Sequence, residues 1–166
     1  MMIQNGISVL SFHTRFDAVE GGVNDVLAAT LGLKDPVPFG PEGEEMGRIG
    51  EVEPCTLPEF AQKVKSALNA PAVLAAGNLP VRRVAVLGGS GSDFVSAAKK
   101  AGADTYFSGE LAYHHLSAAI EDGINLLAAG HYHTENPSLH ALAAFVKQAD
   151  GEIEITLAES DEIQAF

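Results

Sequence analysis

The feature that most constrains the fold of this chain is an alternation of apolar, strand-like runs with amphipathic, helix-like segments. Strands are predicted at 84–87, 104–109 and 124–129, and helices at 94–101, 110–122 and 138–149. A strand, a helix and another strand in succession favour a right-handed crossover between parallel strands. We therefore predict an α/β fold with three layers, in which helices flank a largely parallel sheet.

The first third of the chain shows a less regular pattern. Residues 7–12 are apolar and β-branched and predict a strand, residues 23–31 predict a helix that Gly32 ends, and residues 47–52 predict a short strand. Between them, residues 34–46 carry three prolines and several acids, which predicts a loop.

Two further elements follow from local patterns. Thr56 and Glu59 have the spacing of a capping box, and they predict the start of a helix whose apolar face contains Phe60 and Val64. Polar and apolar residues alternate over 152–157, which predicts a last strand at an edge of the sheet.

Length and charge limit the classes of function. A chain of 166 residues suits one α/β domain, 1–166, with a sizeable core. The formal net charge of −12 repels phosphate backbones and anionic lipids, so we expect neither nucleic acid nor membrane as a partner. The single cysteine, Cys55, excludes an internal disulfide framework. With no membrane-span pattern and no signal-peptide pattern, we expect a cytoplasmic protein.

Imidazole and carboxylate side chains follow three of the predicted strands. The ends of parallel strands share one edge of a sheet, where ligands bind in α/β folds, so these side chains can converge. Both groups are ligands that zinc, iron and manganese accept. Alternatively, the stretch 130–135 is a polar turn with ordinary surface histidines, since its spacing alone matches no strong zinc signature. The residues concerned are His13, Asp17, Glu110, His114, His131, His133 and Glu135.

Other chemistries have weaker signals. The glycine-rich stretch 88–92 lacks the lysine of a P-loop, and we interpret it as a tight turn, with ligand contact through its backbone as the alternative. Ser90 lacks the spacing of a nucleophile elbow. Cys55 lies next to acids, which makes its thiol a poor nucleophile. His140, inside a predicted helix, is interpreted as a surface residue.

Four co-linear motifs carry a resemblance to a known family. They are His13-Thr14-Arg15-Phe16-Asp17-Ala18, Gly21-Gly22-Val23-Asn24-Asp25, Ser108-Gly109-Glu110-Leu111-Ala112-Tyr113-His114 and Gly130-His131-Tyr132-His133-Thr134-Glu135. Over residues 7–157 the chain resembles the Nif-three-like family, also labelled type 2 GTP cyclohydrolase I-like. The resemblance implies an α/β fold with a dinuclear metal site and a ring-shaped hexamer.

The resemblance also implies roles for single residues. Asp17, His131 and Glu135 match metal ligands, and His13, Glu110 and His114 match positions that line the same pocket. Residue 133 is variable in the family pattern, so nothing is carried over to His133.

One part of the family pattern is missing. Its members carry two adjacent metal-binding histidines in a segment ahead of the strand that precedes Asp17, and this chain begins only a few residues before that strand. We therefore expect an N-terminally truncated form, a fragment or a natural short form, that holds fewer than two metal ions and assembles as a homo-oligomer.

Two functions remain open at this stage. The first is a divalent-metal-dependent hydrolase that acts on a nucleotide or another phosphorylated small molecule. In that case a bound metal lowers the pKa of water, and Glu110 or His114 serves as the general base or acid. The alternative is a non-catalytic assembly or partner-binding protein that retains the fold with an incomplete metal site.

Overall fold

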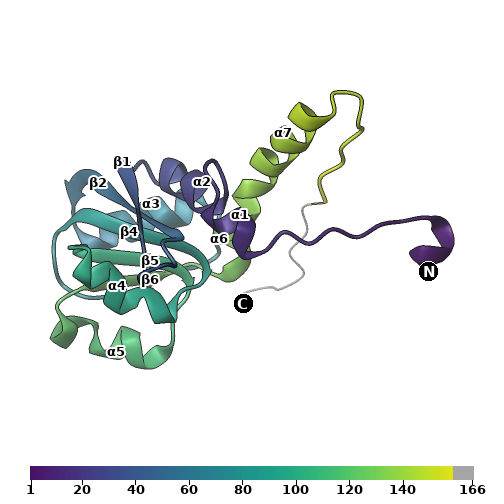
Figure 1. Cartoon of the computed structure of the whole chain (residues 1–166). Helices are drawn as coiled ribbons and strands as arrows, with labels where there is room; N and C mark the ends of the chain where they lie inside the picture. Colours follow the sequence, from purple (N-terminus) through teal and green to yellow (C-terminus); the bar gives the residue numbers. More distant parts are fainter. Residues whose placement is uncertain (159–166) are drawn as a thin grey trace.

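A computed structural model describes residues 1–158 and contains one six-stranded sheet in the order β1-β2-β4-β5-β6-β3 (Figure 1). The strands are β1 (Lys34–Phe39), β2 (Gly47–Cys55), β3 (Leu74–Ala76), β4 (Val81–Ser90), β5 (Thr105–Glu110) and β6 (Asn125–Ala128). The helices are α1 (Thr14–Ala18), α2 (Val23–Thr30), α3 (Leu57–Ala67), α4 (Val95–Lys100), α5 (Tyr113–Asp122), α6 (His131–Glu135) and α7 (Leu139–Ala149). Short 3-10 helices span Ile3–Asn5, Ser92–Phe94 and Asn136–Ser138.

Helices cover both faces of the sheet, and each face has its own hydrophobic core. On one face, Leu27 of α2 and Phe60 of α3 pack in a cluster that includes Phe107 of β5. On the other face, Ala98 of α4 belongs to a cluster with Tyr106 of β5. Adjacent residues of β5 thus point into opposite cores, as the pleat requires. The predicted three-layer α/β class is confirmed.

The parallel part of the sheet is its centre. β4 pairs with β5 and β5 with β6 in parallel, whereas β1–β2, β2–β4 and β6–β3 are antiparallel. The prediction of parallel pairing therefore holds for β4, β5 and β6 only, and the sheet as a whole is mixed. The carboxyl end of β5 carries Glu110, and that of β6 leads to His131 and Glu135.

Both edges of the sheet differ from the sequence-based expectation. The prediction of a loop over 34–46 was wrong for its first part, because β1 occupies Lys34–Phe39. Pro36 and Pro38 are compatible with a strand there, since an edge strand needs only half of its backbone N–H groups for pairing. At the opposite edge, the three-residue β3 pairs with β6 and was not predicted.

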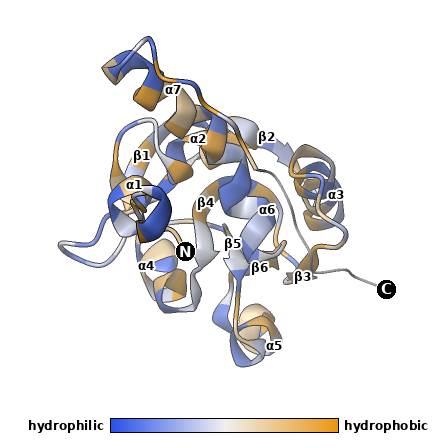
Figure 2. Cartoon of the chain, turned by 90° about the vertical axis from the view of Figure 1, so that its right-hand side faces the viewer, coloured by the Kyte–Doolittle hydropathy of each residue, from blue (hydrophilic) through white to orange (hydrophobic). Residues whose placement is uncertain are grey.

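Two predicted strands do not form. Residues 7–12 and 152–157 are irregular, and their apolar side chains are exposed, with Leu10 79% accessible, apart from the partly buried Leu157. Within residues 1–158 neither segment has a neighbouring strand to supply backbone hydrogen bonds. Helix α7 also has no buried residue, and it stands away from the body (Figure 1); it contains both hydrophobic and hydrophilic residues (Figure 2).

Locally determined features are confirmed. Thr56 and Glu59 form the predicted capping box: Thr56 Oγ1 accepts from the Glu59 N–H (3.4 Å), and Glu59 Oε2 accepts from the Thr56 N–H (2.8 Å). Gly32 adopts a left-handed φ of +70° just after α2, as its predicted stop requires. No helix among the described residues is long and apolar enough to cross a membrane.

Candidate functional site

The centre of the candidate site is the short helix α6, which follows β6. The stretch 130–135 was predicted as a turn; this was wrong, because a helical turn begins after Gly130, whose φ is +95°. His131 and Glu135 are four residues apart and therefore lie on the same side of this helix. Their side chains are in contact, with Nε2 of His131 3.0 Å from Oε1 of Glu135.

A second carboxylate approaches the same imidazole from the sheet. Glu110 is the last residue of β5, and its Oε2 lies 3.4 Å from Nδ1 of His131. His131 is thus placed between two carboxylates, one on each ring nitrogen. All three side chains are about half exposed, so the group is accessible to a ligand.

Two glycines allow α6 to approach the sheet this closely. A Cβ built at Gly89, in β4, would lie 2.4 Å from Oε1 of Glu135 and 3.1 Å from Nε2 of His131. A Cβ at Gly109, in β5, would lie 2.7 Å from Oγ1 of Thr134. Thr134 is buried, and its Oγ1 accepts a hydrogen bond from the Gly89 N–H at 3.0 Å. The prediction of a tight turn over 88–92 was wrong for residues 88–90, because β4 extends to Ser90. Gly89 of this strand forms one wall of the site.

Asp17, on α1, brings a third carboxylate to this region. Burial raises the pKa of Asp17 and the negative charge of Glu135 raises it further, while His13 and His131 act in the opposite direction. Asp17 and Glu135 also line the same cavity, so the two carboxylates face a shared space. His13 immediately precedes α1 and is exposed.

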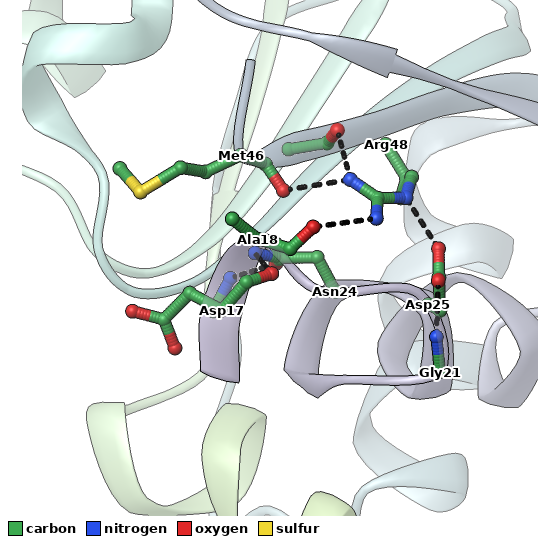
Figure 3. Close-up of polar contacts among 9 residues, drawn as sticks. Asp17, Ala18, Gly21, Asn24, Asp25, Met46 and Arg48 are labelled. Atoms are coloured by element: carbon green, nitrogen blue, oxygen red, sulfur yellow. Dashed lines mark hydrogen bonds and ion pairs between the residues drawn. The ribbon is translucent and has the colours of Figure 1, made fainter. Parts of the chain in front are cut away.

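A buried asparagine fixes α1 against the sheet. Asn24 of α2 is fully buried; its Nδ2 donates to the backbone oxygen of Asp17 (3.1 Å), and its Oδ1 accepts from the Gly88 N–H (2.8 Å). One side chain thus links Asp17 to the end of β4. The carboxylate of Asp17 points away from these contacts and remains available (Figure 3).

An ion pair supports the same region from β2. Nε of Arg48 donates to Oδ1 of Asp25, and its Nη2 donates to the backbone oxygen of Ala18 at 3.3 Å (Figure 3). Arg48 is buried and Asp25 is partly buried. Sequence analysis missed the roles of Asn24, Asp25 and Arg48; only the motif at 21–25 marked the first two.

The remaining histidines lie elsewhere. His114 is exposed on α5, with its ring 4.2 Å from that of His115, and the ion pairs formed by His131 do not involve it. His133 is on α6 with its ring edge-on to Tyr132, and His140 is exposed on α7. The structure therefore places Glu110 and Glu135 against His131, and Asp17 beside the cavity that Glu135 also lines. Among residues 1–158, no ion pair connects His114 to these side chains.

A cavity adjoins the carboxylates. It has a volume of about 260 Å³, and its lining includes Phe12, His13, Phe16, Asp17, Tyr132 and Glu135. Aromatic walls next to acidic groups suit a small molecule with a planar or apolar part. At Cys55, burial, with the nearby Glu59 adding to it, raises the pKa of the thiol, which agrees with its assignment as a poor nucleophile.

The donor set is chemically suited to a divalent metal. Asp17, Glu135 and His131 offer the oxygen and nitrogen ligands that zinc, iron and manganese accept. The cavity that Asp17 and Glu135 line leaves room beside these carboxylates. Within residues 1–158, however, no three His, Cys, Asp or Glu side chains already form a group that could share an ion. Binding would require His131 to exchange its contact with Glu135 for one with the metal.

The fold and site define an α/β protein with an acidic, histidine-containing site at the carboxyl ends of its parallel strands. The chain belongs to the Duf34/NIF3 (NGG1p interacting factor 3) family, whose model matches residues 1–164. The family predicted from the four motifs is confirmed.

Similar proteins agree with this assignment. A protein of Clostridium perfringens named GTP cyclohydrolase 1 type 2 homolog is 35% identical to this chain, and the match covers 95% of this chain and 63% of the relative. A protein of Nostoc sp. with the same name is 38% identical, and that match covers 82% of this chain and 54% of the relative. The chain thus spans between about half and two thirds of these curated relatives. The crystal structure of Staphylococcus aureus protein SA1388 shares the fold, with a TM-score of 0.85 and 24% identity over 99% of this chain and 71% of that one.

Proposed function

We propose that this protein binds one divalent metal ion, zinc, iron or manganese, through Asp17, His131 and Glu135, with His13 as a further ligand. The observation that carries the proposal is the pair formed by His131 and Glu135, 3.0 Å apart on one helical turn, with Asp17 lining the same cavity as Glu135. Fewer than two ions per chain are expected, because these four side chains are too few to complete the coordination of two ions.

We further propose a hydrolytic reaction on a nucleotide or another phosphorylated small molecule, carried out in the cytoplasm. The names of the relatives support this class, and the aromatic cavity beside Asp17 and Glu135 offers space for a substrate. A bound divalent ion supplies a Lewis acid that activates water near neutral pH. Since Glu110 faces Nδ1 of His131, it orients that ring and is the first candidate to accept a proton; His114 is the second.

Metal titration of the metal-free protein tests the first step. Isothermal calorimetry with zinc and with manganese should give a stoichiometry below two, and elemental analysis after dialysis should agree. Two tightly held ions per chain would show that further ligands exist. Hydrolysis assays with a panel of nucleoside triphosphates and simple phosphomonoesters then test the reaction on the loaded protein.

A second candidate function is assembly or partner binding without catalysis. The observation that favours it is the lack, among residues 1–158, of a preformed group of three metal-capable side chains. Metal titration distinguishes the metal-dependent hydrolase from the assembly protein. An assembly protein shows no metal binding at micromolar ion concentrations, and its oligomeric state does not change when a chelator is added.

A further inference from the structure

The end of β4 departs from the regular pairing that it makes with β5. Leu87 of β4 pairs with Ser108 of β5, and the next registered pair joins Ser90 to Glu110. Two residues of β4, 88 and 89, therefore face a single residue of β5. This two-against-one arrangement is a β-bulge, here called the β4 bulge, and bulges of this kind reorient side chains beside functional sites.

Three buried side chains hydrogen-bond to the backbone of the β4 bulge. The Gly88 N–H donates to Oδ1 of Asn24 (2.8 Å), and the Gly89 N–H donates to Oγ1 of Thr134 (3.0 Å). Oγ of Ser108 donates to the backbone oxygen of Gly89 at 3.1 Å. The three residues that supply these side chains are at most 1% exposed, so water cannot replace the bonds that they make.

These side chains come from the elements that position the candidate site. Thr134, on α6, immediately precedes Glu135, and Ser108, on β5, lies two residues before Glu110. Asn24, on α2, also bonds to the backbone of α1. The β4 bulge is therefore the point at which hydrogen bonds join α2, α6 and β5.

The hydroxyl of Thr134 makes the connection on the side of the helix. Besides accepting from Gly89, its Oγ1 lies 2.8 Å from the backbone oxygen of His131 and 3.3 Å from that of Gly130. A hydroxyl has one hydrogen to donate, so the closer oxygen, that of His131, is the main acceptor. One oxygen atom thus joins the β4 bulge to the residue that begins α6.

The position of the His131 ring depends on this junction. The ring contacts Glu110 of β5 through Nδ1 (3.4 Å) and Glu135 of α6 through Nε2 (3.0 Å). Because Glu110 belongs to the sheet and His131 to the helix, any shift of α6 against β5 changes the first of these distances. Metal-capable side chains are held in place by the hydrogen bonds that surround them.

We propose that Thr134 and Ser108 are positioning residues, which act through the β4 bulge to fix the ring of His131 between its two carboxylate partners. This inference rests on the proposed function, because His131 is a proposed metal ligand. The positioning itself is a property of the metal-free protein, and it is measured without an ion.

Nuclear magnetic resonance of the metal-free protein, at one pH for all variants, tests the positioning. Thr134→Val keeps the shape of the side chain and removes the hydroxyl, whereas Thr134→Ser keeps the hydroxyl. In Thr134→Val we expect the signals of the Gly89 amide proton and of the His131 ring to shift away from those of the parent. In Thr134→Ser both signals should stay close to those of the parent.

Ser108→Ala removes the other hydroxyl that bonds to Gly89. We expect it to shift the His131 ring signals in the metal-free protein as well, and it provides the test if Thr134→Val does not fold. Ring signals identical to those of the parent in Ser108→Ala would show that Ser108 does not act on the site.

Thr105→Val is the matched control. Thr105 is a buried threonine at the opposite end of β5, and its Oγ1 also takes part in two hydrogen bonds, donating to Oδ1 of Asp104 (2.6 Å) and accepting from Nδ2 of Asn125 (3.1 Å). Its loss should destabilise the protein and leave the His131 ring signals in place. A ring shift as large as that in Thr134→Val would mean that any loss of stability moves His131, and it would overturn the proposal.

Zinc titration of the same variants measures the consequence for binding. Thr134→Val should weaken zinc affinity by ~10–100-fold, as for the loss of an outer-shell partner, whereas Thr134→Ser and Thr105→Val should bind zinc like the parent. If the ring signals or the zinc affinity of Thr134→Val match those of the parent, the hydroxyl supports the strand only and the proposal is wrong. A parent that binds no zinc contradicts the proposed metal site alone; a ring shift in Thr134→Val then still supports the positioning, and its absence overturns it.

Discussion

Gly89 and Glu135 lie so close together that a Cβ built on Gly89 would stand 2.4 Å from Oε1 of Glu135. Gly89 also has a φ of +70°, a left-handed conformation that side chains other than glycine adopt with strain. The shape of the candidate site therefore depends on the backbone of β4 as much as on the helix that carries the ligands.

The first prediction concerns this glycine. Gly89→Ala should lower the free energy of unfolding by more than the ~1–2 kcal/mol of left-handed strain alone, because the new methyl group also displaces Glu135 and His131. Metal affinity should fall as well. Gly102→Ala is the matched control: φ is +85°, but no atom lies within 4 Å of the added Cβ. Denaturant unfolding and calorimetry compare the two; equal effects of the two variants on both quantities would refute the role of Gly89.

The second prediction concerns the ligands. His131→Ala or Glu135→Ala removes a direct donor, and each should weaken metal binding by more than the ~10–100-fold typical of losing an outer-shell partner. Glu135→Ala should leave the metal-free fold equally or more stable, since one of several nearby carboxylates is removed. His140→Ala, on α7, is the control and should leave metal affinity unchanged, while His133→Ala tests a position on α6 that the family pattern leaves open. If His131→Ala binds metal like the parent, the site is elsewhere.

The third prediction concerns pH in the absence of metal. Burial and Glu135 raise the pKa of Asp17 above its ordinary value of 3.8. The folded protein therefore binds this proton more tightly than the unfolded chain does. The resulting stabilisation is fully present at pH values below the pKa that Asp17 has in the unfolded chain. It is lost as the pH rises through the higher pKa that Asp17 has in the folded protein.

Asp17→Asn removes this dependence. With a chelator present, the variant should be more stable than the parent at neutral pH, and the advantage should shrink as the pH falls towards the ordinary pKa of aspartate. Thermal unfolding across this range provides the measurement, with Glu121→Gln, at an exposed position of α5, as the control. If the stability of the parent relative to Asp17→Asn increased with pH, the predicted direction of the pH dependence would be wrong.

The elements that sequence analysis predicted correctly are those fixed by local chemistry. The capping box at Thr56 and Glu59 is complete within four residues, and the alternation of strands and helices predicts parallel pairing of β4, β5 and β6. The edges depend on tertiary pairing instead. β1 contains Pro36 and Pro38, which a loop also favours, and only its position beside β2 makes it a strand.

In the candidate site, too, the residue types could be predicted from the sequence, whereas the contacts that depend on tertiary structure could not. The sequence marked His131, Glu135, Glu110 and Asp17 because their residue types are suited to metal chemistry. It did not reveal that Asn24 links Asp17 to β4, because a buried asparagine in a helix has no local signature. Residues 7–12 were predicted as a strand from composition, but strand formation also needs a hydrogen-bonding neighbour, and residues 1–158 contain none for this segment.

The last prediction concerns the ion pair that holds α1 and α2 against β2. Arg48→Met leaves the partly buried carboxylate of Asp25 without its partner and removes the hydrogen bond to the backbone oxygen of Ala18. Removing one member of a buried ion pair costs about 3–5 kcal/mol, and we expect ~3 kcal/mol here because Asp25 retains some solvent contact. Urea unfolding measures the loss.

Two further variants make this test specific. Adding Asp25→Asn to Arg48→Met should recover part of the stability, since the unpaired charge is then gone. Glu51→Gln breaks the exposed pair with Arg83, 3.0 Å apart in the structure, and should change stability by only ~0–1 kcal/mol. Because Asp17 and Ala18 share one short helix, Arg48→Met should also weaken metal binding, whereas Glu51→Gln should not. If Arg48→Met destabilises the protein but leaves metal affinity intact, the ion pair supports the fold without positioning Asp17.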